Sequence, residues 1–180
     1  EWNTQPTETR VSLRFSNQSK GMAPREATYL YGGGSFGSTY NDGRAPVDVP
    51  IPTAAKKVEL WAIVTGHGSG TNQCSEFCNH QHEFTVAGNT HLDEFPVAGT
   101  ADGCVAEIED QATPNQWGTW WYGRGGWCPG QLVEPYVVDV TSEVTPGADA
   151  TVSYRGLYDG GTPPDGSGDI VLNSWLVVYE

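Results

Sequence analysis

The stretch Lys56-Lys-Val-Glu-Leu-Trp-Ala-Ile-Val64 has the strongest strand pattern in the first half of the chain. Its β-branched and aromatic residues favour strands because they pack well on a pleated sheet. Similar residues, mostly alternating with polar ones, recur outward from it in short segments. These segments are residues 11–15, 27–31, 46–52, 83–86, 90–95, 132–140, 150–157 and 169–179. Together they predict an all-β chain of eight or nine strands.

The composition supports the same fold class. The 180 residues include 23 Gly and 12 Pro, with 7 Trp and 8 Tyr but a single Met, which disfavours long helices. No helical pattern exceeds two turns, and no internal repeat or linker divides the chain. We therefore expect one antiparallel two-sheet β-sandwich of jelly-roll type over residues 1–180, with residues 1–8 as a flexible tail.

The net charge of −13 narrows the range of partners. Phosphate backbones and anionic membrane surfaces would repel so acidic a chain, so we expect no nucleic acid partner. No apolar run reaches the roughly 18 to 20 residues that a membrane span requires, so we expect no membrane insertion. Because the chain starts at Glu1 without an initiator Met or a basic-then-apolar leader, we expect a processed product.

Four cysteines, at positions 74, 78, 104 and 128, bear on the compartment. Their spacing matches no zinc finger, so oxidised pairs are the preferred interpretation, ahead of a zinc site or free thiols. Three disulfide connectivities remain open from the spacing alone. Two disulfides predict a protein that is secreted, periplasmic or exposed at the cell surface.

The first candidate site is Cys74-Ser-Glu76-Phe-Cys78, in which a carboxylate lies between two cysteines. A disulfide across so short a loop would add less global stability through loop closure than one across a long loop. It would instead fix the position of Glu76, as a working residue requires. The alternative is a turn staple with an incidental exposed glutamate.

The second candidate site is the segment Trp117-Gly-Thr-Trp120-Trp-Tyr-Gly-Arg124-Gly-Gly-Trp127-Cys-Pro-Gly130. Aromatic faces bind the apolar faces of sugars, and a guanidinium donates hydrogen bonds in a fixed fork. The tryptophans are separated by glycines and follow no alternating pattern. A concave binding surface is therefore favoured over an ordinary core cluster.

Four motifs carry a resemblance to a known family. They are Thr-Gly-His67-Gly, Cys74-Ser-Glu76-Phe-Cys78-Asn-His80-Gln-His82, Asp102-Gly-Cys104 and Arg124-Gly-Gly-Trp127-Cys128-Pro-Gly. The chain resembles, from residue 11 to residue 179, the C-terminal half of the bacterial peptide N-glycosidase F family. Enzymes of that family hydrolyse the amide between an asparagine side chain and the first sugar of an N-linked glycan.

The resemblance implies a set of site residues and an antiparallel jelly roll. It implies that Glu76 is a catalytic-site glutamate. It places Arg124 and His67 near the substrate, and Phe77 where the family has a tryptophan. The cleft would also be lined by Trp120 and Trp127. The implied disulfides are Cys74–Cys78 and Cys104–Cys128.

The resemblance also implies that half of the active site is missing. The family's principal catalytic aspartate, and a second glutamate, lie in an N-terminal jelly roll that this chain does not contain. We therefore expect an N-linked glycan or glycopeptide as ligand and no cofactor. Catalysis would need a second jelly-roll domain, covalent or separate, and the isolated chain should be inactive; a homo-oligomer is a further possible partner arrangement.

Two other function classes remain open. By fold resemblance, the jelly roll is shared with copper monooxygenases, and His80 and His82 lie at i and i+2, on one face of a strand. No third ligand is evident, so we expect polar strand histidines and no metal. The other class is a secreted, non-catalytic assembly subunit that exchanges a strand through residues 1–8.

Overall fold

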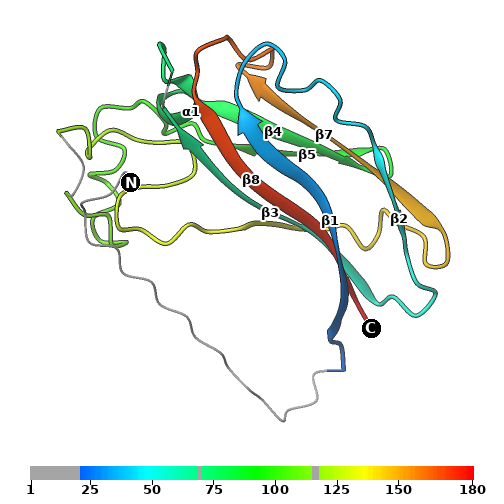
Figure 1. Cartoon of the computed structure of the whole chain (residues 1–180). Helices are drawn as coiled ribbons and strands as arrows, with labels where there is room; N and C mark the ends of the chain where they lie inside the picture. The colour runs from blue at the N-terminus through cyan, green and yellow to red at the C-terminus, as the bar shows by residue number, and fades with distance from the viewer. Residues whose placement is uncertain (1–20, 69, 115–117) are drawn as a thin grey trace, which may run out of the picture.

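A computed structural model describes residues 21–68, 70–114 and 118–180 of the protein. Its strands and single short helix are, in chain order, β1 (Pro24–Ser35), β2 (Val47–Pro50), β3 (Lys57–His67), α1 (Cys74–Phe77), β4 (His80–Val86), β5 (Asn89–Glu94), β6 (Tyr136–Asp139), β7 (Asp149–Tyr158) and β8 (Asp169–Tyr179). The strands form two four-stranded antiparallel sheets, ordered β1-β8-β3-β6 and β2-β7-β4-β5 (Figure 1). The predicted all-β sandwich is confirmed, with eight strands in the described part. The predicted strand at residues 11–15 and the tail at 1–8 lie outside the described residues.

Strand β3 lies inside its sheet and pairs along its whole length with β8. Alternate residues of β3, from Val58 to Val64, are buried between the sheets, and the residues between them face outward. The facing sheet contributes Phe84, Val86 and Val152 to the same apolar core. The period-two pattern that predicted β3 therefore marks its buried face.

Strand β1 is longer than the predicted strand at 27–31 and runs through Gly32–Gly34. Its pairing with β8 shifts register on either side of Gly32. A Cβ atom on Gly33 would lie 1.9 Å from the Ile170 carbonyl oxygen, so only glycine lets β1 approach β8 this closely. In contrast, β6 is shorter than the predicted strand at 132–140, because it begins only after Pro135.

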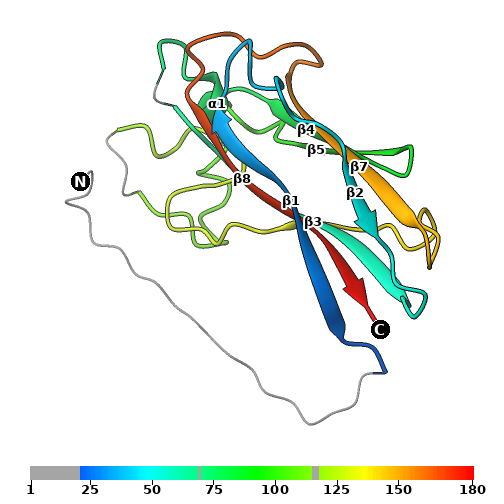
Figure 2. The same ribbon diagram turned by 45° about the vertical axis from the view of Figure 1, so that its right-hand side comes forward.

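The long irregular segments lie at one end of the sandwich. Figures 1 and 2 show the loop segments of residues 95–114 and 118–135 at the same end as α1, which follows β3. Cys74 is bonded to Cys78 across α1, and Cys104 is bonded to Cys128 within the long loop. We call this end of the sandwich, formed by α1 and the long loop, the loop end. Each of its two parts contains a disulfide. None of the helices in the described residues is long and apolar enough to cross a membrane.

Candidate active site

The Glu76 carboxylate is fixed from two sides at the loop end. One oxygen, Oε1, accepts a hydrogen bond of 2.7 Å from Arg124 Nε, and the other, Oε2, accepts one of 2.8 Å from the Gly68 backbone N–H. Glu76 lies on α1, which the Cys74–Cys78 disulfide closes. Its side chain remains 14% exposed. The carboxylate is therefore oriented by charge-assisted hydrogen bonds and still accessible to a ligand.

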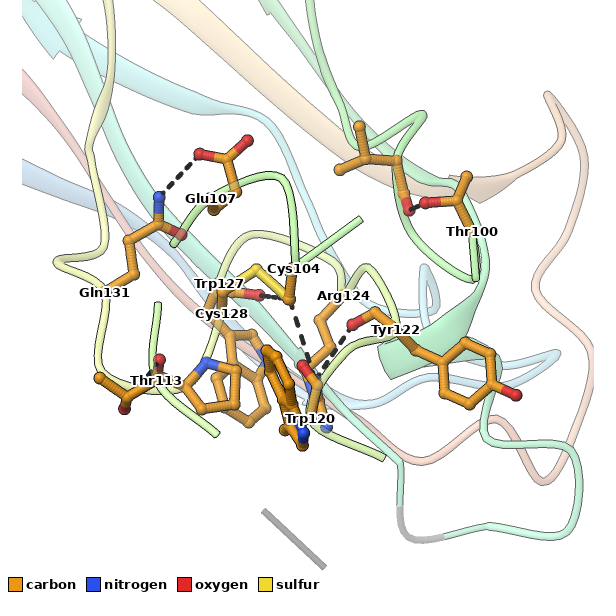
Figure 3. Close-up of a disulfide and its surroundings, with 12 residues drawn as sticks. Thr100, Cys104, Glu107, Thr113, Trp120, Tyr122, Arg124, Trp127, Cys128 and Gln131 are labelled. Atoms are coloured by element: carbon orange, nitrogen blue, oxygen red, sulfur yellow. Dashed lines mark hydrogen bonds between the residues drawn. A yellow bond between two sulfur atoms is a disulfide. The ribbon is translucent and has the colours of Figure 1, made fainter. Parts of the chain in front are cut away.

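The Arg124 side chain is fully buried, and its donors are used within the protein. Besides Glu76, it donates through Nη1 to the backbone carbonyls of Trp120 and Tyr122, which Figure 3 shows beside it. Through Nη2 it donates to the backbone carbonyl of Thr119. The resemblance placed Arg124 near the substrate. This geometry instead makes Arg124 a group that orients Glu76 and closes the loop around it.

Two aromatic rings lie close to the guanidinium of Arg124. Its Cζ atom lies 5.2 Å from the ring centroid of Phe77 and 4.9 Å from that of Trp127. Cation–π contacts of this kind strengthen when the cation is shielded from water. The Phe77 ring is thus part of the support around the ion pair, in addition to any role toward a ligand.

His67 and Trp127 form one edge of the site. His67 is the last residue of β3 and faces outward, and its ring centroid lies 5.4 Å from that of Trp127. Burial lowers the pKa of His67, although the carboxylates of Glu76 and Asp169 oppose that shift. The imidazole is therefore neutral at physiological pH, with Nε2 2.9 Å from the Thr65 hydroxyl.

Two glycines let three backbone segments meet beneath Glu76. The Gly66 N–H donates to the Gly125 carbonyl, and the Gly125 N–H donates to the Glu76 carbonyl. A Cβ atom on Gly66 would lie 1.5 Å from the Ser75 carbonyl oxygen, and one on Gly125 would lie 2.0 Å from His80 Nε2. The glycines of the Thr-Gly-His and Arg-Gly-Gly-Trp motifs are therefore required by close backbone approach.

The second disulfide anchors the aromatic loop. Cys104 and Cys128 are both buried, and the Cys104 N–H donates to the Trp121 carbonyl. Figure 3 shows Arg124 beside this disulfide, with Trp120 and Trp127 nearby. Trp127 Nε1 also donates to the Gly66 carbonyl at 2.8 Å, which ties the loop to β3.

An open pocket of about 270 Å³ adjoins the site. Phe77 and Tyr122 form its aromatic wall, with ring centroids 6.3 Å apart, and Gln73 and Thr119 add polar groups. Of the pocket residues, the sequence prediction included only Phe77. Tyr122 belongs to the aromatic segment of residues 117–130, but no sequence pattern distinguished it from the neighbouring aromatic residues. Trp120 is half-buried and lies outside the pocket lining, while Trp117 lies outside the described residues.

The weak metal candidates His80 and His82 share one face of β4, as predicted, but that face is the buried one. Their rings bond to each other, with His80 Nδ1 2.8 Å from His82 Nε2. Among the described residues, no group of three or more His, Cys, Asp and Glu side chains could hold a metal ion. The histidine on β5, His91, lies 2.9 Å from Glu143 Oε2 and is only partly exposed.

Sequence comparisons connect the chain to known proteins. The sequence model of a family described as Peptide-N-glycosidase F, C terminal, matches residues 35–177, which include the whole site. The peptide-N(4)-(N-acetyl-beta-D-glucosaminyl)asparagine amidase F of Elizabethkingia miricola is 30% identical over 128 residues. The match covers 68% of this chain and 34% of that relative, so the chain spans about a third of the relative's length.

Solved structures share the fold. A crystal structure of a peptide-N(4)-(N-acetyl-beta-D-glucosaminyl) asparagine amidase superposes with a TM-score of 0.62 at 18% identity, covering 86% of this chain and 51% of the other. Another, PNGase F from Flavobacterium meningosepticum, described as a glycosylasparaginase, gives 0.58 at 16% identity, covering 87% and 51%. The chain thus matches about half of each of these two structures.

Proposed function

The chain belongs to the peptide N-glycosidase F C-terminal family, and on that basis we propose that it forms the glutamate-bearing half of an amidase site that releases N-linked glycans from asparagine. The single observation that carries the proposal is the Glu76 carboxylate, which is held by Arg124 Nε and the Gly68 N–H yet remains partly exposed. Such a fixed carboxylate is suited to recognising a substrate.

Amide hydrolysis needs a base for water, stabilisation of the developing oxyanion and a proton for the leaving nitrogen. In our proposal Glu76 is the catalytic residue that faces the substrate, accepting a hydrogen bond from the amide N–H or a sugar hydroxyl. Arg124 acts through Glu76, because its own donors are already bonded within the protein. The base that activates water would come from the family's aspartate in a partner domain.

The aromatic groups around Glu76 suit a glycan. Phe77 and Tyr122 wall a pocket beside the ion pair, and Trp127 with His67 forms one edge of the site. Such rings bury the apolar faces of sugars with little loss of side-chain entropy. Trp120, half-buried in the same loop, would extend this surface toward the second sugar.

A partner domain would dock on the outer face of the β1-β8-β3-β6 sheet. One register of that sheet carries an apolar row across all four strands, formed by Tyr29, Trp175, Trp61 and Val137. Tyr29 is 51% exposed and Val137 39%. Surface rows of this kind are typical of interfaces. His67 lies at the end of the same face, so a domain docked there would border the Glu76 site.

The two disulfides favour an oxidising compartment, and we propose that the chain acts outside the cytoplasm. An N-linked glycoprotein substrate would be met in the same setting. Activity in the presence of a reductant that cleaves both disulfides would count against this placement.

Titration with N,N′-diacetylchitobiose by isothermal calorimetry tests the ligand. We expect saturable binding to the wild-type chain and at least a tenfold loss in Glu76→Gln. The control is Glu83→Gln, which removes the same charge from an ion pair with Arg155 on β4 and β7, and should bind like the wild type. No binding to the wild-type chain would favour a non-catalytic subunit instead.

A further inference from the structure

Four buried side chains form a continuous hydrogen-bonded series between the two sheets. The Tyr40 hydroxyl lies 2.9 Å from the Tyr154 hydroxyl, which lies 2.7 Å from His82 Nδ1. His82 Nε2 is in turn 2.8 Å from His80 Nδ1. The series ends at His80 Nε2, a buried atom with no hydrogen bond of good geometry among the described residues. The proposed function uses none of these four groups.

Both imidazoles are neutral at physiological pH. Burial lowers the pKa of His80 to about 4, and burial, His80 and Arg44 place the pKa of His82 well below its ordinary value. The rings of Phe36 and Phe95 flank His80, with centroids 5.7 and 4.9 Å away. Because a neutral imidazole carries one N–H, the proton shared between the two rings couples their tautomers. Either both rings are protonated on Nε2, or both on Nδ1.

The two ends of the series decide between these states. If both rings were protonated on Nδ1, Tyr154 would donate to Tyr40, and the Tyr40 hydroxyl hydrogen would have no acceptor among the described residues. If both are protonated on Nε2, the hydrogen bonds run from Tyr40 to His80, and the last N–H is directed at the backbone of Ser75. The Ser75 carbonyl oxygen and His80 Nε2 both lie against the Gly66 Cα, and the Ser75 backbone opposes the lowering of the His80 pKa. The second state leaves fewer buried groups unpaired.

The last nitrogen of the series touches the backbone under the active site. A Cβ atom on Gly66 would lie 1.5 Å from the Ser75 carbonyl oxygen and 2.7 Å from His80 Nε2, so both atoms rest on the bare Cα of Gly66. The bare Cα of Gly125 also lies against His80 Nε2. Gly125 donates to the Glu76 carbonyl. The His80 ring therefore supports the peptide that leads into Glu76.

We propose that His80 and His82 are a tautomer-locked pair, both protonated on Nε2, through which the buried tyrosines orient the Ser75 carbonyl and hold the backbone of Glu76. His80 is thus a positioning residue that acts through Ser75 and Gly125. Its importance for catalysis rests on the proposed function, whereas the tautomers themselves do not. Three of the four ring nitrogens of the pair are used in hydrogen bonds to each other and to Tyr154.

The tautomers are measured directly by long-range ¹H–¹⁵N correlation on the wild-type chain at pH 7. We expect both rings to show a protonated Nε2 and an unprotonated Nδ1. A ring protonated on Nδ1, or a mixture of tautomers, would overturn the proposal. This measurement needs no substitution, so it does not depend on any variant folding.

Two tyrosine variants test the direction in which the hydrogen bonds of the series run. Tyr154→Phe removes the donor to His82 Nδ1, and we expect a second tautomer to appear in both rings. Tyr40→Phe is the control, because Tyr154 keeps its own hydroxyl hydrogen for His82, and it should leave both rings unchanged. The reverse pattern, with Tyr40→Phe altering the tautomers and Tyr154→Phe not, would contradict the proposed direction.

The Arg124 Nε–H resonance reports whether His80 positions the site. His80→Gln keeps an N–H at the position of Nε2 and should preserve this resonance and the chitobiose affinity. His80→Phe keeps a ring but no donor, and should shift and broaden the resonance and weaken chitobiose binding at least fivefold. Equal resonances in the two variants would overturn the positioning role. If chitobiose binds none of these proteins, the wild type included, the proposed function fails while the resonance still decides the positioning role.

Discussion

The sandwich core and the loop end of this protein are held together by different means. Between the sheets, alternate apolar residues such as Leu60 and Phe84 exclude water, and their contribution scales with the area they bury. At the loop end (Figure 2), a buried ion pair, two disulfides and bare glycine backbones fix the structure. The core tolerates changes that keep volume and polarity. The loop end depends on individual atoms, as a site that orients a carboxylate requires.

Two similar ion pairs sharpen this contrast. Arg124 and Arg155 each bond through Nε to a glutamate Oε1, at 2.7 and 2.6 Å, but their side chains are 0% and 58% exposed. Arg124→Met should lower the free energy of unfolding by about 4 kcal/mol, because it strands Glu76 and three backbone carbonyls. Arg155→Met should cost no more than about 1 kcal/mol. Urea unfolding of both variants measures this, and equal losses would contradict the account.

The two disulfides differ in the length of chain they close. Replacing Cys104 and Cys128 by Ser should cost about 3.5 kcal/mol, because the bond spans 24 residues. Replacing Cys74 and Cys78, which are four apart, should cost only about 2 kcal/mol on the same basis. We expect the short one to matter more for chitobiose binding, since it closes α1 around Glu76. Thermal unfolding of both double variants measures the loss of stability, and calorimetry measures chitobiose binding. A larger loss of stability in the Cys74 and Cys78 variant, or a larger loss of binding in the Cys104 and Cys128 variant, would contradict this account.

Glycine contacts distinguish the loop end from ordinary turns. Gly66→Ala would place a methyl group 1.5 Å from the Ser75 carbonyl oxygen, and we expect a loss of about 3 kcal/mol in unfolding free energy. Gly161→Ala is the control, because its nearest contact would be the Tyr158 carbonyl oxygen at 3.5 Å. It should change stability by less than about 0.5 kcal/mol. A tolerated Gly66→Ala would show that the three segments do not meet as described.

Two titratable groups on the inner faces of the sheets, His80 and Asp93, make the stability of the fold depend on pH in opposite directions. The pKa of His80, lowered to about 4, means that its contribution to stability is full above about pH 6.5 and is lost as the pH falls toward 4. Burial raises the pKa of Asp93 to about 7, so its contribution is full below about pH 3.8 and is lost as the pH rises through 7. Between pH 7 and 4 the Asp93 trend therefore opposes the trend of His80, to which the lowered pKa of His82 adds.

Asp93→Asn removes one of these opposing trends. We expect the variant to be more stable than the wild type at pH 7 and to lose about 2 kcal/mol more on acidification to pH 4. Denaturant titrations at a series of pH values check this, with Asp110→Asn, at an exposed position, as the control. Parallel pH profiles for Asp93→Asn and the wild type would refute the assignment.

The sequence predicted the fold better than it predicted the site. Alternation identified β3, β7 and β8 because one face of each strand is buried along most of its length. It could not show that β1 continues through Gly32–Gly34, since that depends on close approach to β8. Nor could it show that Arg124 is buried, because its acceptors are carbonyls of a loop without any periodic pattern. The inward direction of His80 likewise follows from register across the sheet.

Release of glycan from a denatured N-glycoprotein tests the central claim most directly. The chain alone should release none, whereas the chain joined to the part of the Elizabethkingia relative that lies outside the match should restore release. Glu76→Gln in the joined protein should reduce the rate at least a hundredfold, and Glu83→Gln should leave it unchanged. Release at enzyme-like turnover by the chain alone, or a joined protein indifferent to Glu76→Gln, would contradict the account.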